Sequence, residues 1–379
     1  MDFDLNDEQK LLKDSVEKLI AQHYDFEQRK KYLQAPEGWQ RDLWARYAEM
    51  GLLGLPFAED DGGFGGGAVE TMIVMEAFGR GLVLEPYFAT VVLAGGILRH
   101  AASPAQRAAL IPAIAAGELC AAFAHAERQA RYDLADVATS ARESNGTWRL
   151  SGEKSLVLHG DQADRLIVSA RVSGERRAHD GIGLFLVDGK APGIARRGYA
   201  LQDGTRAAEI SLADVAGEPI GTPGAAFPII ARIADEAIAA LCAEAVGVMA
   251  AMHEVTLDYL RTRKQFGRPI GQFQVLQHRA VDMLVAIEQA RSMAYFATMM
   301  AAENDAAERR RALAAAKVQI GRSGRKVGQE AIQLHGGIGM MMEYKVGHYF
   351  KRMTMIEMLF GDADHHLAEL AAIGGLITT

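Results

Sequence analysis

The fold is decided by residues 259–283, which read Tyr-Leu-Arg-Thr-Arg-Lys-Gln-Phe-Gly-Arg-Pro-Ile-Gly-Gln-Phe-Gln-Val-Leu-Gln-His-Arg-Ala-Val-Asp-Met. One helical pattern enters this stretch from about Phe227, and a second begins at Phe273. The residues that break the helix between them are Gly267, Pro269 and Gly271. Because glycine frees the backbone and proline removes a hydrogen-bond donor, the stretch predicts a sharp corner between two long helices.

Positive charge gathers at this corner, where the cations are Arg263, Lys264 and Arg268. By charge alone they form a solvated helix end whose cations face the helix dipole. The order of the residues adds a second interpretation. The chain carries Arg263-x-Gln265-Phe266-Gly267 and then Phe273-Gln274-x-x-Gln277. This pattern resembles the flavin-binding corner of the acyl-CoA dehydrogenase family.

The resemblance implies a task for the corner. In the family, the arginine and the polar residue two positions on hold the FAD pyrophosphate of the neighbouring subunit. A guanidinium suits that task because it is permanently charged and its fork matches phosphate oxygens. The cofactor contacts implied here are Arg263, Gln265, Phe266, Phe273 and Gln274.

A second motif reads Gln333-Leu334-His335-Gly336-Gly337-Ile338-Gly339. It resembles the family segment that meets the adenosine and pyrophosphate end of the same FAD, where glycine lets the backbone approach the ligand. The ordinary alternative is a helix C-cap, for which glycine is the usual residue. The cofactor contacts implied here are Gln333, Leu334, His335, Gly336 and Gly337, with His335 in a packing role rather than an acid–base role.

The composition excludes several other classes of protein. The chain has 379 residues, of which 49% are hydrophobic and 23% charged, as in an ordinary globular protein of two or three domains. A net charge of −7 argues against nucleic acid as the main partner. The two cysteines, Cys120 and Cys242, lie far apart and favour neither a disulfide nor a zinc site. No leader segment and no membrane-length apolar run is expected, since Glu244 interrupts the best candidate, so the sequence predicts a cytoplasmic protein.

The order of elements predicts an α+β fold with helical residues 1–118, a β domain at 119–225 and helical residues 226–379. Helix starts are predicted at Asn6, paired with Gln9, and at Ser103-Pro104-Ala105-Gln106. A hairpin is predicted at Asn145-Gly146, and strands at Leu166–Val168, Leu184–Val187 and Ile210–Leu212. This order is similar to that of the acyl-CoA dehydrogenases, which implies an N-terminal helical domain, a middle β-barrel or sandwich and a C-terminal four-helix bundle.

Three local features have ordinary explanations at this point. The glycine-rich run at residues 60–67 has no preceding strand and no phosphate-loop lysine, so it is interpreted as a flexible turn. The methionines near the C-terminus, at positions 340–342, 353, 355 and 358, are predicted to pack in the core. The adjacent pair His365-His366 is predicted to point to different helix faces at the surface, so no metal site is assigned.

The resemblance also implies a reaction, the α,β-dehydrogenation of an acyl-CoA thioester, with an electron-transfer flavoprotein as the acceptor. A carboxylate in a dry pocket removes the α-proton, and the flavin takes the β-hydride. The family position for that base is Phe360, and the family's other base position is Ala237. Neither side chain can accept a proton, so the weak candidates are Asp362 and Glu236. In the middle domain, the flavin-ring contacts of the family correspond to Ala126–Gln129 and Leu156–Leu158, which lack the family's glycine and hydroxyl.

This chain therefore keeps the half-site that is donated to a neighbour and loses the half-site that it would use itself. Its ends resemble the smaller subunit of two-subunit members of the family. The first hypothesis is a non-catalytic subunit that completes the FAD site of a larger homologous subunit in a heterotetramer. The second is a self-sufficient homo-oligomer with a displaced base. The third is a binding or scaffold protein on the same fold without flavin.

Overall fold

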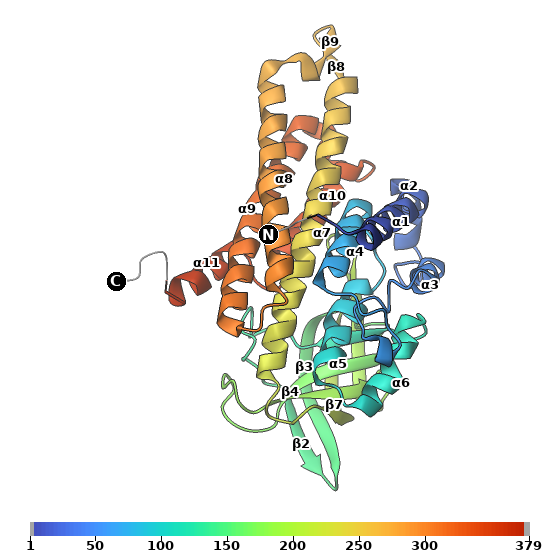
Figure 1. Cartoon of the computed structure of the whole chain (residues 1–379), viewed down its shortest axis with the longest axis vertical. Helices are drawn as coiled ribbons and strands as arrows, with labels where there is room; N and C mark the ends of the chain where they lie inside the picture. Colours follow the sequence, from blue (N-terminus) through green and yellow to red (C-terminus); the bar gives the residue numbers. More distant parts are fainter. Residues whose placement is uncertain (1–3, 375–379) are drawn as a thin grey trace. The chain divides into compact units, whose positions relative to one another are not determined.

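The structure, a computed structural model, describes residues 4–374 (Figure 1). Helices come first along the chain, strands follow, and long helices return, which confirms the predicted α+β order. Two compact units result. The helical unit takes the described residues of Met1–Lys31, Ala68–Val83 and Ile238–Thr379. The mixed unit takes Tyr32–Gly67 and Leu84–Ala237.

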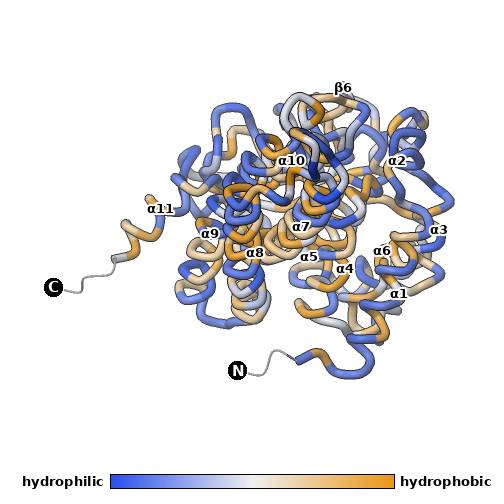
Figure 2. Tube along the Cα trace, turned by 90° about the horizontal axis from the view of Figure 1, so that it is seen from above, coloured by the Kyte–Doolittle hydropathy of each residue, from blue (hydrophilic) through white to orange (hydrophobic). Residues whose placement is uncertain are grey.

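The helical unit is built from long helices that lie side by side (Figures 1 and 2). Its elements are α1 (Asp7–His23), α2 (Phe26–Leu33), α4 (Ala68–Gly81), α7 (Phe227–Thr262), α8 (Gln274–Met300), α9 (Ala306–His335), η4 (Gly336–Met340), α10 (Lys345–Met358) and α11 (Ala363–Ala372). The helices α7, α8, α9 and α10 form the predicted four-helix bundle. Buried small residues such as Ala286, Ala290 and Ala294 on α8 allow close packing between helices.

The helix starts follow the predicted capping chemistry. The side chain of Asn6 accepts from the backbone N–H of Gln9 at 2.8 Å, and the Gln9 side chain accepts from the N–H of Asn6 at 3.0 Å. Ser103 and Gln106 form the same reciprocal pair before α6, with Pro104 at the first helical position. Each pair satisfies two backbone donors that the first helical turn leaves free.

The expectation that no apolar run reaches membrane-spanning length was wrong for α7. By length and composition this helix is apolar enough to cross a membrane, but its most apolar window is 89% buried inside the structure. Glu244, which interrupts that window, is buried and paired with Arg352 of α10, with 2.7 Å between Oε2 and Nη2. The apolar length of α7 is therefore that of a core helix, and its buried charge has a partner.

The mixed unit packs short helices with a β-sheet. Its helices are α3 (Arg41–Glu49), η1 (Glu59–Asp61), η2 (Phe88–Ala94), α5 (Gly95–Ala101) and α6 (Pro104–Ala115). Its strands are β1 (Ala121–Ala124), β2 (Ser140–Ser144), β3 (Thr147–Leu158), β4 (Arg165–Arg171), β5 (Ile182–Asp188), β6 (Ile194–Ala200) and β7 (Arg206–Ile220). The glycine-rich run follows η1 as a turn, and in residues 4–374 no strand precedes it.

The seven strands form one sheet that closes on itself. Neighbours follow the order β1-β4-β2-β3-β7-β5, β6 pairs with β7, and β4 pairs again with β5. The last pairing returns the order to β4, so few edges stay open, and the predicted barrel-like middle is confirmed. The interior is filled by apolar side chains, among them Leu150, Leu166, Val168, Phe185, Val187, Ile210 and Val215.

The predicted hairpin joins β2 and β3. Asn145 has φ 51° and Gly146 has φ 75°, the left-handed pair that a two-residue hairpin turn requires. The three predicted strand cores fall within β4, β5 and β7, while β1 and β6 were missed. The alanine-rich β1 has weak strand propensity, and β6 carries adjacent arginines, Arg196 and Arg197.

Candidate functional site

The corner between α7 and α8 is a tight hairpin. It consists of β8 (Lys264–Gln265) and β9 (Arg268–Pro269), followed by η3 (Ile270–Gln272). Phe266 and Gly267 form the turn with φ values of 53° and 77°. The left-handed region is open to glycine but unusual for phenylalanine, so the turn holds Phe266 in a strained backbone.

The side chains of this hairpin are exposed. Phe266 is 90% exposed, and its ring meets Phe273 edge-on with 6.1 Å between centroids. The Arg268 guanidinium lies over the Phe273 ring, 4.2 Å from its centroid. In the described residues, no carboxylate pairs with Arg263, Lys264 or Arg268. The corner therefore offers three cations without a carboxylate partner in the described residues, one of which, Arg268, is stacked on Phe273.

The start of α8 adds backbone donors to these cations. The residue before the helix, Phe273, makes no side-chain cap hydrogen bond, and Gln274 is exposed in the first turn. Gln277 donates from Nε2 to the carbonyl of Gly271 at 2.8 Å, which fixes the backbone of the corner. An uncapped helix N-terminus beside arginines is an arrangement that favours phosphate groups.

The second motif forms the end of α9. Gly336 has φ 62° and caps the helix, as the ordinary interpretation of its glycines requires. Gly336 and Gly337 are exposed, and a Cβ atom built on either meets nothing within 4 Å. The chain's own packing does not require a small residue at Gly337. The open space there suits the backbone approach of a ligand.

His335 joins the two motifs. Its ring stacks on Tyr259, the first residue of the decisive stretch, with 4.5 Å between centroids, and lies 5.1 Å from Tyr344. Nδ1 donates to the carbonyl of Ala331 at 2.7 Å, and burial lowers the pKa of His335, so the ring is neutral and Nε2 is an acceptor. That buried Nε2 has no partner in the described residues. These residues fit the adenosine and pyrophosphate half of FAD, which brings donors and phosphates to such groups.

The family's base position holds no acid. Phe360 lies in the turn between α10 and α11 with φ 58°. Asp362, the nearest carboxylate, caps α11 by accepting the N–H of His365 at 2.9 Å. Its role in the structure is therefore that of a helix cap.

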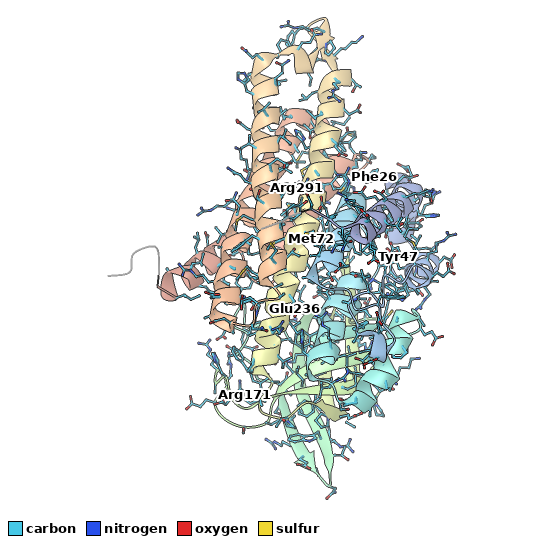
Figure 3. All side chains as sticks on the ribbon, viewed as in Figure 1. Phe26, Tyr47, Met72, Arg171, Glu236 and Arg291 are labelled. Carbon is cyan, nitrogen blue, oxygen red and sulfur yellow. The ribbon has the colours of Figure 1, made fainter. Side chains whose placement is uncertain are left out.

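Glu236 of α7, the other weak candidate, is labelled in Figure 3. It pairs with Arg99 at 2.5 Å, His100 at 2.7 Å and Arg232 at 3.1 Å. Burial alone would raise the pKa of Glu236, but the contact with His100 and the charges of Arg99 and Arg232 more than offset it and hold the pKa below its ordinary value. A general base needs the opposite shift. Ala237 beside it is fully buried and apolar.

The loop after β1 contains a charged core that the sequence did not reveal. Glu127 is buried and accepts from the ammonium of Lys154 at 2.7 Å and from the N–H groups of Ala138 and Thr139. Burial alone would raise the pKa of Glu127, yet these donors, Lys154 above all, lower it to about 2. The loop predicted to correspond to a flavin contact thus uses its carboxylate to anchor itself within the mixed unit. Leu158, at the end of β3, brings no hydroxyl.

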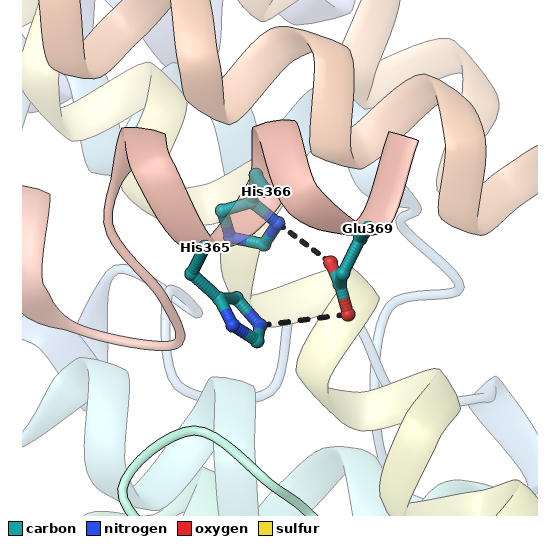
Figure 4. Close-up of side chains that lie close together, drawn as sticks. All are labelled: His365, His366 and Glu369. Atoms are coloured by element: carbon teal, nitrogen blue, oxygen red, sulfur yellow. Dashed lines mark hydrogen bonds and ion pairs between the residues drawn. The ribbon is translucent and has the colours of Figure 1, made fainter. Parts of the chain in front are cut away.

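The adjacent histidines behave differently from the prediction. His366 is fully buried, and ligand atoms of His365, His366 and Glu369 lie within 4.8 Å of one another (Figure 4). Both rings reach Glu369 because this residue lies one helical turn further on, three residues after His366 and four after His365. Arg310 already donates to both oxygens of Glu369, at 2.6 and 2.8 Å. An arginine in that position favours an ion-pair network over a cation site.

The prediction that the C-terminal methionines pack in the core was right for two of the six. Met353 and Met355 are buried, as expected. Met340, Met341, Met342 and Met358 are all more than half exposed or close to it, at 76%, 50%, 56% and 53%. Three of the exposed methionines, Met340 to Met342, lie at the end of η4 and just after it, and Met358 is the last residue of α10.

Three family models match the chain in sequence order. They are "Acyl-CoA dehydrogenase, N-terminal domain" at residues 6–118, "middle domain" at 122–215 and "C-terminal domain" at 228–374. A probable acyl-CoA dehydrogenase, YngJ of Bacillus subtilis (strain 168), is 28% identical over 376 residues, which cover 96% of this chain and 97% of that protein.

Two solved structures are similar along nearly the whole chain. The FAD complex of PigA has a TM-score of 0.89 at 26% identity and covers 98% of both chains. A Tcur3481-Tcur3483 steroid ACAD variant has a TM-score of 0.87 at 28% identity and covers 97% of both chains.

Proposed function

The chain belongs to the acyl-CoA dehydrogenase family, whose cofactor is FAD, and we propose that it is a subunit that completes the FAD site of a larger, homologous catalytic subunit. The observation that carries this proposal is an asymmetry within the helical unit. The corner at Arg263 offers to an anion an open helix N-terminus and cations that have no carboxylate partner among residues 4–374, whereas the base position holds Phe360.

The residues of this chain have distinct tasks in that arrangement. Arg263, with Gln265 beside it, binds the pyrophosphate through charge-assisted hydrogen bonds. The backbone at Gly336 and Gly337 admits the adenosine end, and His335 accepts from one of its hydrogen-bond donors. When bound, FAD supplies the electron sink for α,β-dehydrogenation of an acyl-CoA thioester. The base comes from the partner subunit.

The partner and the substrate are part of the same proposal. One matched structure carries a name that joins two proteins, Tcur3481 and Tcur3483, which supports a heteromeric assembly such as a heterotetramer. We further propose, from a resemblance of the two ends of the sequence to the small subunit of pimeloyl-CoA dehydrogenase, that the substrate is pimeloyl-CoA or another dicarboxylyl-CoA. The residues of that N-terminal resemblance that precede Asp4 lie outside the described part of the chain. An electron-transfer flavoprotein in the cytoplasm is the proposed acceptor.

The self-sufficient alternative has less support. It needs Asp362 or Glu236 as the base, but the first caps a helix and the second is paired with two arginines and a histidine. Glu236 lacks the unpaired surroundings that raise the pKa of a buried carboxylate toward neutrality.

The test is to purify the chain alone and with a co-expressed larger homologue, record the flavin absorbance of each, and then add acyl-CoA without air. We expect the chain alone to be colourless or unbleached and the complex to be yellow and bleached by substrate. Full flavin occupancy and bleaching of the chain alone would establish the self-sufficient enzyme instead. A colourless complex would point to the scaffold protein.

A further inference from the structure

A single buried lysine holds the turn that carries Phe360. Lys317 of α9 is 1% exposed, and its ammonium donates to backbone carbonyls at 2.8–2.9 Å. Four carbonyls accept, those of Ile356, Glu357, Leu359 and Gly361, so they share the three N–H groups of the ammonium. The first two lie in the last turn of α10, where carbonyls have no helical partner. The other two lie beyond the helix end, so Lys317 holds the turn as well as the helix.

His366 approaches the same turn from α11. Its Nε2 lies 3.0 Å from the carbonyl of Phe360, and its Nδ1 lies 2.9 Å from Glu369. Both partners are acceptors, so the ring satisfies both only with a proton on each nitrogen. Burial lowers the pKa of His366, which leaves one contact without its proton at neutral pH. Lys317 is therefore the steadier of the two supports.

The backbone of the turn is constrained to match. Phe360 has φ 58° and Gly361 has φ 107°. A Cβ atom at Gly361 would lie 2.5 Å from His365 and 2.6 Å from Nε2 of His366, so only glycine fits there. A bulky residue in the left-handed region persists only where its surroundings determine the conformation. Here those surroundings are the carbonyl contacts of Lys317 and the packed histidines.

We propose that Lys317 is a positioning residue, which fixes the turn at residues 359–361 so that the side chain of residue 360 keeps one direction. That residue 360 is the family's base position rests on the proposed function. The turn then keeps the backbone conformation that would hold a general base, and it carries a phenylalanine in place of a carboxylate. The held conformation itself does not depend on flavin or on a partner.

The direct test places one fluorine label, as 4-fluorophenylalanine, at position 360 of the full chain. We expect one ¹⁹F resonance, shifted away from that of the unfolded chain. In Lys317→Met the resonance should lose that shift and move to the averaged position, while circular dichroism keeps the helical signal. The matched control is Lys326→Met, which removes an exposed lysine from the same helix. An unchanged resonance in Lys317→Met would overturn the proposal.

The unmutated chain supplies a second measurement in case Lys317→Met does not fold. Burial lowers the pKa of Lys317 to about 8, although Cys242, Glu357 and Asp362 partly oppose it. Raising the pH through about 8 removes one donor from the turn, so the label at 360 should respond with that midpoint. A label at exposed Phe266 should not. A flat response at position 360 would count against the role of the ammonium.

The ability of the turn at residues 359–361 to hold a general base is tested by Phe360→Glu, with Phe360→Gln as its isosteric control. In the FAD-loaded complex in D₂O, the partner subunit's base already exchanges the α-proton of an acyl-CoA thioester, and Phe360→Gln measures that background. The new carboxylate of Phe360→Glu should take the α-proton and return a deuteron as well, so label enters the α-carbon faster than in Phe360→Gln. Short, medium and dicarboxylic thioesters are all offered. Uptake above the Phe360→Gln background that Lys317→Met abolishes supports the proposal that the turn can hold a base. No uptake above that background beside a normal ¹⁹F result would remove the acid–base role and leave the fixed turn standing.

Discussion

The corner at Arg263 and the turn at Phe360 lie in the same helical unit, but they differ in whether their polar groups have partners within the chain. The corner leaves its cations without a carboxylate partner in the described residues, and Phe266 is almost fully exposed. The turn has nearly every carbonyl satisfied by a buried side chain, Lys317 or His366. Both contain a left-handed aromatic residue, but only in the turn do internal contacts explain it.

This difference separates what the chain completes by itself from what it leaves for a partner. Saturated carbonyls around a buried ammonium contribute to the stability of the unit, because an unmade hydrogen bond there would be costly. Exposed arginines contribute little to stability and are free to bind an anion. Substitutions in the turn should therefore change unfolding, and substitutions in the corner should change cofactor binding.

The largest expected effect is on stability. Lys317→Met removes the three N–H groups that four backbone carbonyls share, and we expect the free energy of unfolding to fall by about 3–5 kcal/mol. Arg263→Ala should change it by less than about 0.5 kcal/mol, because the side chain is exposed. Urea titrations followed by circular dichroism measure both. Equal losses of unfolding free energy in the two variants would contradict the view that the turn stabilises the unit and the corner does not.

The next effect is on FAD retention in the complex with the larger subunit. Arg263→Ala should weaken FAD by about 10- to 100-fold, the value of one charge-assisted hydrogen-bond pair. Arg263→Lys should recover only part of this, because an ammonium lacks the guanidinium fork. Equilibrium dialysis against free FAD gives the ratio. Arg142→Ala, in exposed β2, is the control and should leave FAD binding unchanged.

The mixed unit also contains a buried charged pair, Glu127 with Lys154, and its contribution to stability should depend on pH. The folded-state pKa of Glu127 is about 2, below the ordinary value of 4.5, so its contribution to stability is complete above about pH 4.5 and is lost as the pH falls toward 2. We expect about 2 kcal/mol to be lost across this window, measured by thermal unfolding at a series of pH values. Glu127→Gln should remove this part of the acid dependence, and Glu143→Gln, at an exposed site, should keep it. An acid dependence unchanged by Glu127→Gln would assign the effect to other carboxylates.

The sequence predicted those parts of the molecule that local patterns determine. The corner was visible because Gly267, Pro269 and Gly271 interrupt a strong helical period, and the hairpin was visible because Asn145-Gly146 tolerates left-handed angles. The motif residues of the candidate site follow from the same local patterns together with the family resemblance. Their binding of FAD stays a prediction.

The parts that the sequence could not predict depend on distant partners. Lys317 stands in an ordinary helical pattern, and nothing near it shows that its ammonium meets carbonyls about 40 residues further on. The pair of Glu127 with Lys154, 27 residues apart, is equally invisible to periodicity. We predicted His366 at the surface because adjacent residues diverge on an ideal helix. In the structure its ring is buried and contacts Glu369, which also accepts from Arg310. Charge in a sequence marks a residue but not its partner.

The smallest expected effect tests whether Phe266 serves the fold or a ligand. Its left-handed backbone and 90% exposure cost stability, while its ring meets Phe273 edge-on. Phe266→Asn should therefore raise the free energy of unfolding by about 0.5–1 kcal/mol, because asparagine tolerates that conformation better. The same variant should weaken FAD binding in the complex if the ring covers the cofactor. Phe273→Leu, which removes the platform under Arg268 but not the strain, should weaken FAD without the gain in stability. A less stable Phe266→Asn chain would show that the ring supports the corner itself, and the corner would then no longer be a region left open for a partner.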